Sequence, residues 1–385
     1  LDKKMIKNNI PRIRFNNFKA FWVEKKIADI VKISAGGDVD KVRLKKSGKY
    51  PVIANALTNK GIVGFYDDYK VKAPAVTVTG RGDVGYAVAR HENFTPIVRL
   101  LTLQSENIDV DYLENQINSM RILNESTGVP QLTAPQLGKY KVYHPEIEEQ
   151  SAIGNLFRTL DDLLASYKDN LANYQALKAT MLSKMFPKAG QRVPEIRLDG
   201  FEGEWEIKRA DEIFKSVSEK NRASLPVLSA SQIDGMVLRD EIGIDIKYDE
   251  ATLNNYKVVK PGQFVIHLRS FQGGFALSKL EGITSPAYTI IDFIDKSNNL
   301  SYFWNSILTS RDFIKRLETV TYGIRDGKSI SFKDFSSLKF VFPEFKEQQA
   351  IGSYFSNLDN LINSHQEKIS QLETLKKKLL QDMFI

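Results

Sequence analysis

The chain contains one long sequence segment twice, and this duplication limits the possible folds more than any other feature. Residues 145–186 align with residues 343–384 at a constant offset of 198 without a gap, and 17 of the 42 paired positions are identical. A shorter repeat precedes each domain: IPRIRFNNFKAFW from Ile10 aligns with VPEIRLDGFEGEW from Val193 at an offset of 183. Because repeats at a fixed spacing indicate repeated structural units, we expect two similar halves related by a pseudo-two-fold axis.

Both copies of the long segment have the periodicity of an amphipathic helix. Pro145 and Pro343 suit a helix start, and the acidic residues that follow favour the positive end of the helix dipole. Each helix alone would leave its apolar stripe in water, so we expect an antiparallel coiled coil that acts as a spacer. The apolar residues recur at steps of four and three, and they are Ile153, Phe157, Leu160, Leu164, Tyr167, Leu171 and Tyr174, then Ile351, Phe355, Leu358, Ile362, Ile369, Leu372 and Leu379.

The sequences that precede the two helices differ widely from each other, and both predict mixed α/β domains. Short β-rich runs such as IVGFY and AVTVTG, and in the second half FVIHLRS and AYTIIDFI, alternate with turn residues. Helical stretches follow Asp109 and Asn299. We therefore predict an α+β fold with globular domains at residues 1–144 and 188–342, and with helical spacers at residues 145–187 and 343–385.

Composition sets weaker limits on function. The net charge of +7 is concentrated at the N-terminus, because residues 1–50 hold 14 basic and 5 acidic residues whereas residues 201–385 hold 24 and 25. A nonspecific polyanion binder would be basic throughout, so charge alone leaves DNA binding open. There is no cysteine, no apolar run of membrane-spanning length and no secretory signal. We expect a soluble, cytoplasmic protein.

Polar loops carry the candidate recognition residues. Residues 80–85 spell G-x-G-x-x-G, but the run that follows has strand character, whereas a dinucleotide site needs a helix there. Arginine can bond bidentately to guanine and glutamine to adenine, so we predict base or phosphate contacts from these loops instead. For any one of these side chains, the alternative is simple solvation. The candidates are Arg81, Gln131, Arg269, Gln272, Arg325 and Lys328.

Catalytic motifs are missing from the sequence. The four histidines have no metal-ligand spacing, and the chain has no G-x-S-x-G, Walker A, H-E-x-x-H or amino-methyltransferase motif. We expect no catalytic residue, no metal and no cofactor in this chain. A fused methyltransferase is disfavoured for the same reason, while a coiled-coil adaptor that binds only proteins is the open alternative.

A domain followed by a Pro-x-x-x-Glu-Gln-x-x-Ile helix, duplicated once, resembles the specificity subunit of type I restriction-modification systems over nearly the whole chain. The resemblance implies that each domain reads one half of a split, asymmetric double-stranded DNA target and that the coiled coil sets the gap. It implies assembly with two methyltransferase subunits, which bring S-adenosylmethionine, and with restriction subunits, which use ATP and Mg²⁺. For partner docking we predict the helix positions Gln150, Phe157, Gln348 and Phe355.

Overall fold

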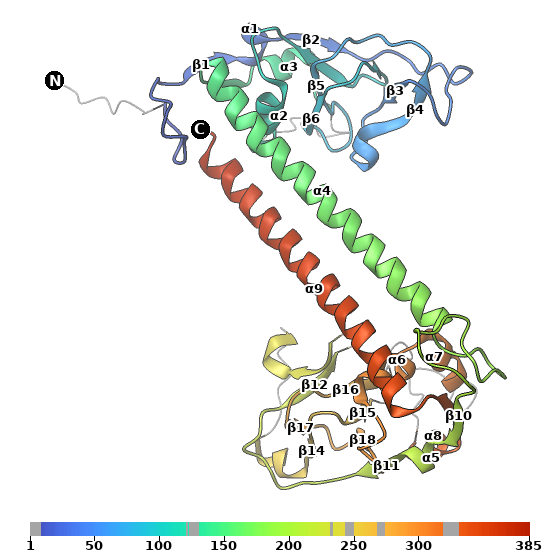
Figure 1. Cartoon of the computed structure of the whole chain (residues 1–385). Coiled ribbons are helices and arrows are strands. Elements are labelled where there is room, and N and C mark those ends of the chain that lie inside the picture. Colours follow the sequence, from blue (N-terminus) through green and yellow to red (C-terminus); the bar gives the residue numbers. More distant parts are fainter. Residues whose placement is uncertain are drawn as a thin grey trace. The chain divides into compact units, whose positions relative to one another are not determined.

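The chain folds into two compact units. The computed structural model describes residues 9–120, 122, 131–231, 234–242, 250–267, 274–318 and 331–385. Unit 1 comprises residues 1–170 and 365–385, and unit 2 comprises residues 171–364. Two helices of 38 residues, α4 (Ile147–Lys184) and α9 (Phe345–Asp382), contribute to both units (Figure 1). The two predicted long helices are therefore confirmed, and each begins two residues after its proline.

The domain of unit 1 is built on a four-stranded antiparallel sheet of order β2-β8-β5-β6. A second sheet of order β4-β3-β7 contains a parallel pair, and β1 pairs with β9 beside the start of α4. The elements are β1 (Val23–Lys26), α1 (Ile27–Ile30), β2 (Lys32–Ala35), β3 (Tyr50–Ile53), β4 (Ile62–Tyr66), β5 (Ala75–Val78), β6 (Ala87–Arg90), β7 (Thr95–Pro96), β8 (Leu101–Gln104), α2 (Val110–Ser119), α3 (Ala134–Gly138) and β9 (Lys141–His144).

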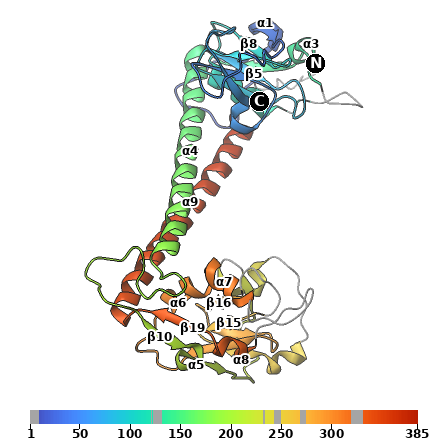
Figure 2. The same ribbon diagram turned by 90° about the vertical axis from the view of Figure 1, so that its right-hand side faces the viewer.

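The domain of unit 2 repeats this plan with a four-stranded antiparallel sheet of order β11-β18-β15-β16 (labelled in Figure 1), and Figure 2 shows the same unit from another side. The pair β10-β19 occupies the place of β1-β9, and two short pairs, β12-β13 and β14-β17, complete the described strands. The elements are β10 (Glu206–Arg209), α5 (Ala210–Ile213), β11 (Phe214–Val217), β12 (Leu228–Ser231), β13 (Gly235–Leu238), β14 (Lys257–Val259), β15 (Phe264–Ile266), β16 (Phe275–Leu277), β17 (Gly282–Thr284), β18 (Thr289–Phe293), α6 (Ser301–Leu308), α7 (Arg311–Glu318), α8 (Phe332–Ser336) and β19 (Lys339–Phe342).

The four-stranded sheets of the two domains have the same topology but different cores. In unit 1, Leu113 and Ile117 of α2 pack with aliphatic residues of the sheet such as Val76. In unit 2 the corresponding core is aromatic, and Phe214 contacts Trp304 with ring centroids 5.1 Å apart. In both domains the central strands β5 and β15 are buried at every residue. The prediction of one mixed α/β fold in two sequence versions is confirmed.

The long helices pack against each other in both units, and they run antiparallel. In unit 1, Lys168 of α4 lies 2.7 Å from Glu373 of α9, and Tyr167 lies beside His365. In unit 2, Lys178 of α4 pairs with Asp359 of α9. In the part of the chain that the structure describes, no helix is long and apolar enough to cross a membrane.

Candidate nucleic-acid interface

In each unit, a half-buried arginine of the shorter repeat pairs with a buried glutamate of the long helix. In unit 1, Arg14 Nε and Nη2 donate to the carboxylate of Glu149 at 2.6 and 2.7 Å. In unit 2, Arg197 makes two such bonds to Glu347, both of 2.8 Å. These hydrogen bonds raise the pKa of both guanidinium groups. Bidentate, charge-assisted bonds fix direction as well as distance. They therefore fix the orientation of each shorter repeat, from Ile10 or from Val193, relative to the long helix of its unit.

The glutamine that follows each of these glutamates ties the long helix to a shorter helix of the domain. Gln150 accepts a hydrogen bond from the Asp109 N–H at 3.1 Å, and Gln348 accepts one from the Leu300 N–H at 3.1 Å. Asp109 and Leu300 are the N-cap residues of α2 and α6. The duplicated Glu-Gln motif thus makes the same links to two domains that differ in sequence.

The four residues predicted to dock a partner lie inside the units. Gln150 and Gln348 make the bonds just described, Phe157 packs against Phe384 with ring centroids 5.7 Å apart, and Phe355 belongs to the core of unit 2. All four side chains are almost completely buried. These four side chains therefore have almost no exposed surface with which to contact a partner while the units are folded. A docking surface on the helices has to use other residues.

The helix seam contains a charged pair that the apolar periodicity does not reveal. Lys376 pairs with Asp161 in unit 1, and Lys178 pairs with Asp359 in unit 2. Both lysines occupy seam positions, and both pairs occur at equivalent places of the repeat with the helices exchanged. A lysine at a seam position specifies register at some cost in stability. The signal in the sequence is the identity of Lys178 with Lys376 and of Asp161 with Asp359.

Two of the predicted contact residues, Arg81 and Gln131, lie side by side in unit 1. They form an isolated antiparallel bridge, although 50 positions separate them in the sequence. Arg81 lies on the hairpin between β5 and β6, so the G-x-G-x-x-G motif is a turn between strands and not the strand-to-helix turn of a dinucleotide site. Both side chains are exposed. The other four candidates, Arg269, Gln272, Arg325 and Lys328, lie outside the described residues.

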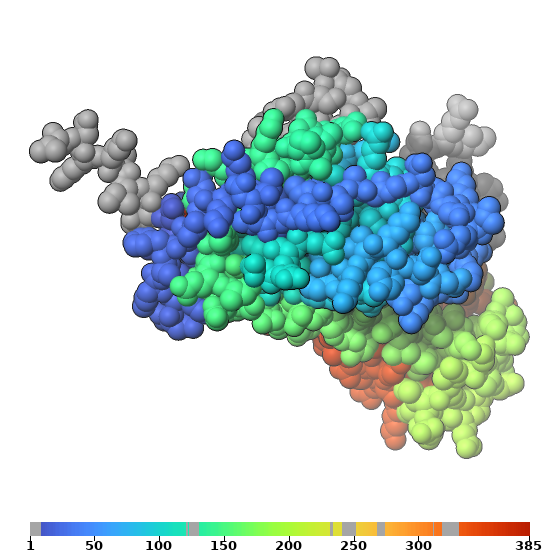
Figure 3. All heavy atoms as spheres, turned by 90° about the horizontal axis from the view of Figure 1, so that it is seen from above, coloured from blue at the N-terminus to red at the C-terminus, as the bar shows by residue number. Residues whose placement is uncertain are grey.

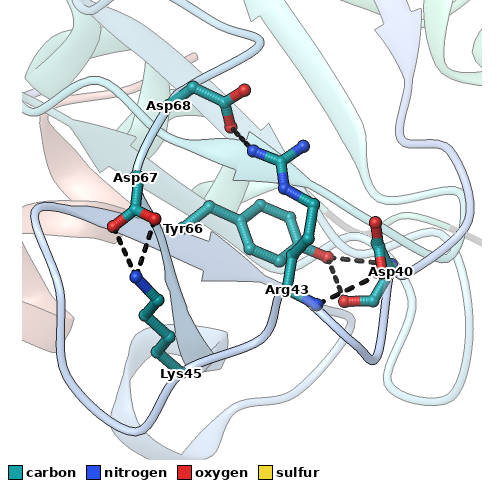
Figure 4. Close-up of polar contacts among 6 residues, drawn as sticks. All are labelled: Asp40, Arg43, Lys45, Tyr66, Asp67 and Asp68. Atoms are coloured by element: carbon teal, nitrogen blue, oxygen red, sulfur yellow. Dashed lines mark hydrogen bonds and ion pairs between the residues drawn. The ribbon is translucent and has the colours of Figure 1, made fainter.

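The positive charge of the loop between β2 and β3 in unit 1 is partly neutralised by aspartates that follow β4. Arg43 donates to Asp68 at 2.8 Å and Lys45 to Asp67 at 2.7 Å, while the hydroxyl of Tyr66 donates to the Asp40 carbonyl (Figure 4). The hydrogen bond from Arg43 holds the pKa of the Asp68 carboxyl below its usual range. The N-terminal part of the unit, dark blue, lies exposed across the face seen in Figure 3.

The described residues offer no metal site, since no group of three or more histidine, aspartate or glutamate side chains is placed to hold an ion. The exposed donors Arg81 and Gln131 can instead bond to base edges or phosphate oxygens. The structure thus defines a class of protein in which two repeated helices carry domains of unlike sequence, one of them with two exposed donors side by side.

Comparison with known families identifies this class. Residues 20–173 and 202–374 each match the family described as the type I restriction modification DNA specificity domain. The chain belongs to this family, because the two matches together cover most of its length.

Individual relatives show the same kinship at low sequence identity. The MjaVIII specificity subunit of a type I restriction enzyme from Methanocaldococcus jannaschii is 24% identical over 275 residues, which are 66% of this chain and 64% of the relative. A Mycoplasma pneumoniae chain named as type I specificity subunit S.MpnORF507P is 26% identical over 155 residues, which are 39% of this chain and 43% of the relative. The match thus spans less than two-thirds of the length of these relatives.

A solved structure has the same fold. The S subunit of a type I restriction-modification system from M. genitalium superposes with a TM-score of 0.68 and 16% sequence identity, and the match covers 98% of this chain and 99% of that chain. The expected fold class is therefore confirmed over both halves of the chain.

Proposed function

We propose that this chain is the DNA-recognition subunit of a type I restriction-modification complex. Each domain reads one half of a bipartite, asymmetric double-stranded DNA target, and the two long helices set the gap between the halves. Two unlike domains on one repeated frame support an asymmetric target, since operator symmetry mirrors protein symmetry. The observation that carries the proposal is the pairing of Arg81 with Gln131 at the surface of unit 1.

The chemistry of this pair favours DNA over a protein partner. A guanidinium and a primary amide side by side can each bond bidentately to a purine in the major groove. Neither side chain has a hydrogen bond or an ion pair within the described parts of the chain. A coiled-coil adaptor that binds only proteins is the alternative, and it gives no reason for two unpaired donors to be brought together there.

The partners would carry the reaction chemistry. We propose that this subunit is not itself an enzyme and holds no cofactor, that two methyltransferase subunits bring S-adenosylmethionine, and that restriction subunits use ATP and Mg²⁺. We also propose a cytoplasmic location for the complex, where cellular DNA is within its reach. The family membership supports this assignment, and the absence of catalytic motifs from the sequence is consistent with it.

The exposed leucines of the long helices are the better candidates for docking the methyltransferase subunits. Leu163 and Leu361 occupy equivalent positions of the repeat, as do Leu177 and Leu375, and between 37% and 44% of each is exposed. Each leucine directly precedes a seam residue, so it flanks the seam on the edge opposite to Lys168 and Glu373. Identical apolar residues in both units suit two copies of one partner.

Reconstitution with the methyltransferase subunit encoded with this chain tests the function. The complex, expressed in cells that lack other DNA methylation, should methylate one split motif, which sequencing of the methylated genome would reveal. Arg81→Ala together with Gln131→Ala should relax bases in one half of the motif only, whereas the control Arg43→Ala should leave the motif unchanged. Methylation without any sequence preference, or a complex that binds no DNA, would refute the proposal.

A separate measurement tests the docking surface. Leu163→Gln with Leu375→Gln removes the apolar edge in unit 1 and leaves that of unit 2 intact. Native mass spectrometry should then find one methyltransferase subunit bound in place of two. Two bound subunits at unchanged affinity would exclude the leucines as the docking site.

A further inference from the structure

A single asparagine joins the hairpin that carries Arg81 to a neighbouring loop of unit 1. The side-chain oxygen of Asn55 accepts a hydrogen bond from the Gly80 N–H at 2.7 Å, and its amide nitrogen donates to the Val98 carbonyl at 2.7 Å. Asn55 follows β3, Gly80 follows β5, and Val98 lies between β7 and β8. The position of Arg81 is thus coupled to that of the segment that connects β7 of the second sheet to β8 of the first.

That segment has an uncommon backbone conformation. Val98 and Arg99 are consecutive non-glycine residues with φ of 52° and 59°, in the left-handed region. Such a conformation is rare for a β-branched residue and, where it persists, clusters at functional sites. Two backbone bonds hold it, from Val98 N–H to Gly37 O at 2.7 Å and from Arg99 N–H to Gly36 O at 3.0 Å.

Three chain segments converge at Gly80. A Cβ on this residue would lie 2.9 Å from the Leu132 carbonyl oxygen and 3.1 Å from that of Arg99. The backbones at Leu132 and Arg99 thus approach Gly80 more closely than a side chain there would permit. Arg81 follows Gly80 in the sequence, and Gln131 precedes Leu132. Together with Arg99, they place three exposed side chains on three adjoining segments.

The arginines of this domain differ in what they bind. Arg43 is paired with Asp68, and Arg90 is buried, where it donates to Thr77 at 2.9 Å. Arg81 and Arg99 make no side-chain hydrogen bond or ion pair with any part of the chain that the structure describes. Among the described arginines of the domain, these two are therefore unpaired, and they lie on the two segments that Asn55 joins.

We propose that Arg99 is a third specificity-determining residue for the first half of the DNA target, acting beside Arg81 and Gln131, and that Asn55 is the positioning residue for the group. The proposal rests on the proposed DNA-reading function. A phosphate contact needs only a positive charge nearby. Bidentate bonding to a base edge also requires a defined guanidinium geometry, and the hydrogen-bonded backbone of Arg99 fixes the position from which its side chain extends.

The test uses the reconstituted complex with its methyltransferase subunit. Arg99→Gly removes the guanidinium and suits the left-handed backbone, so the domain should stay folded. Arg99→Lys keeps the charge and loses the bidentate geometry. Both variants should relax one base position in the first half of the methylated motif and lower affinity for the target duplex by about 10- to 100-fold, with the second half unchanged. The control Arg43→Ala should change neither quantity.

Two outcomes would overturn the assignment. An unaltered motif with unaltered affinity would remove Arg99 from recognition. Full rescue by Arg99→Lys, or a loss that is equal on all DNA sequences with a smaller salt dependence, would make Arg99 a phosphate contact. Failure of the proposed function is a different result, because the wild-type complex itself would then show no motif.

The positioning role of Asn55 has its own readout. Asn55→Ala should relax the same base positions that Arg81→Ala and Arg99→Gly relax. Added to Arg81→Ala and Arg99→Gly together, it should cause almost no further loss, because it acts through those side chains. An additive loss in the triple variant, or a lower melting temperature without any change in the motif, would contradict that role.

Discussion

Glu149 and Glu347 are carboxylates with almost no solvent contact, and each is balanced by one arginine from the N-terminal repeat of its unit. Removing one partner of such a pair leaves a buried charge uncompensated, which costs about 3–5 kcal/mol. The identity of Glu149 with Glu347 and of Arg14 with Arg197 is visible in the sequence, but their pairing is not, because 135 and 150 positions separate the partners.

Glu114 on α2 makes the stability of unit 1 depend on pH. Burial, with Asp161 next in effect, raises its pKa from 4.5 to about 7. The folded state therefore holds its proton longer than the unfolded state, so this group's contribution to stability is complete below about pH 4.5 and is lost as the pH rises through 7. At 1.36 kcal/mol per unit, the loss is at most about 3 kcal/mol.

Glu114→Gln should remove this pH dependence, since the amide has the shape of the neutral acid. In urea unfolding at pH 5 and pH 8, the wild-type free energy of unfolding should fall more between the two values than that of the variant. The variant should be the more stable protein at pH 8. An equal change in the free energy of unfolding between pH 5 and pH 8 for both proteins would show that Glu114 titrates normally in the folded chain.

Gly154 of α4 and Gly352 of α9 are equivalent glycines at different close contacts. A Cβ at Gly154 would clash with the Asp109 carboxylate, which caps α2, and would lie 3.0 Å from the Tyr112 nitrogen. A Cβ at Gly352 would meet the end of the Leu300 side chain at 2.9 Å, and that side chain can move. The same residue in the repeat therefore meets a rigid obstacle in unit 1 and a flexible one in unit 2.

Alanine at these two positions should have unequal effects. Gly154→Ala should destabilise unit 1 by about 2 kcal/mol or more, through overpacking and a displaced cap. Gly352→Ala should be close to neutral, because the better helix propensity of alanine offsets a small shift of Leu300. Hydrogen exchange during urea unfolding, followed separately in α2 and α6, measures both. Equal losses in the two variants would contradict the contact geometry.

Much of the element scale could be predicted from the sequence. The helices follow from a local period of apolar residues, and the strands from short β-branched runs between turns. The seam lysines Lys178 and Lys376 could not be predicted this way, because a search for apolar residues passes over them. The neighbourhood of Arg81, Gln131 and Arg99 depends on which strands pair, and pairing is set by tertiary packing.

At the scale of the whole molecule, the proposed function depends on repeated helices that carry two domains of different sequence. Of the predicted contact residues, Arg81 and Gln131 lie in unit 1 and are described, whereas those of unit 2 lie outside the described residues. Their contacts with DNA stay predictions. The functions of the two domains can nonetheless be separated by experiment, because each unit has its own core.

The spacer role of the helices predicts a change in gap length. One heptad inserted after Leu171 and one after Ile369, which are equivalent positions, keeps the seam in register. Seven residues add about 10 Å of helix, which corresponds to about three base pairs of DNA. The methylated motif should keep both halves and gain that number of unspecified bases. An unchanged gap would exclude the spacer role, and a heptad in one helix alone should misalign the ion pairs.

The most direct test of two independent readers is a domain exchange. Residues 21–144 are replaced by the corresponding domain of a related specificity subunit, and the methylated motif of the reconstituted complex is read by sequencing the DNA of its host. If the two domains read DNA independently, the motif should have a new first half, with the second half and the gap unchanged. A change in both halves, or in neither, would contradict it.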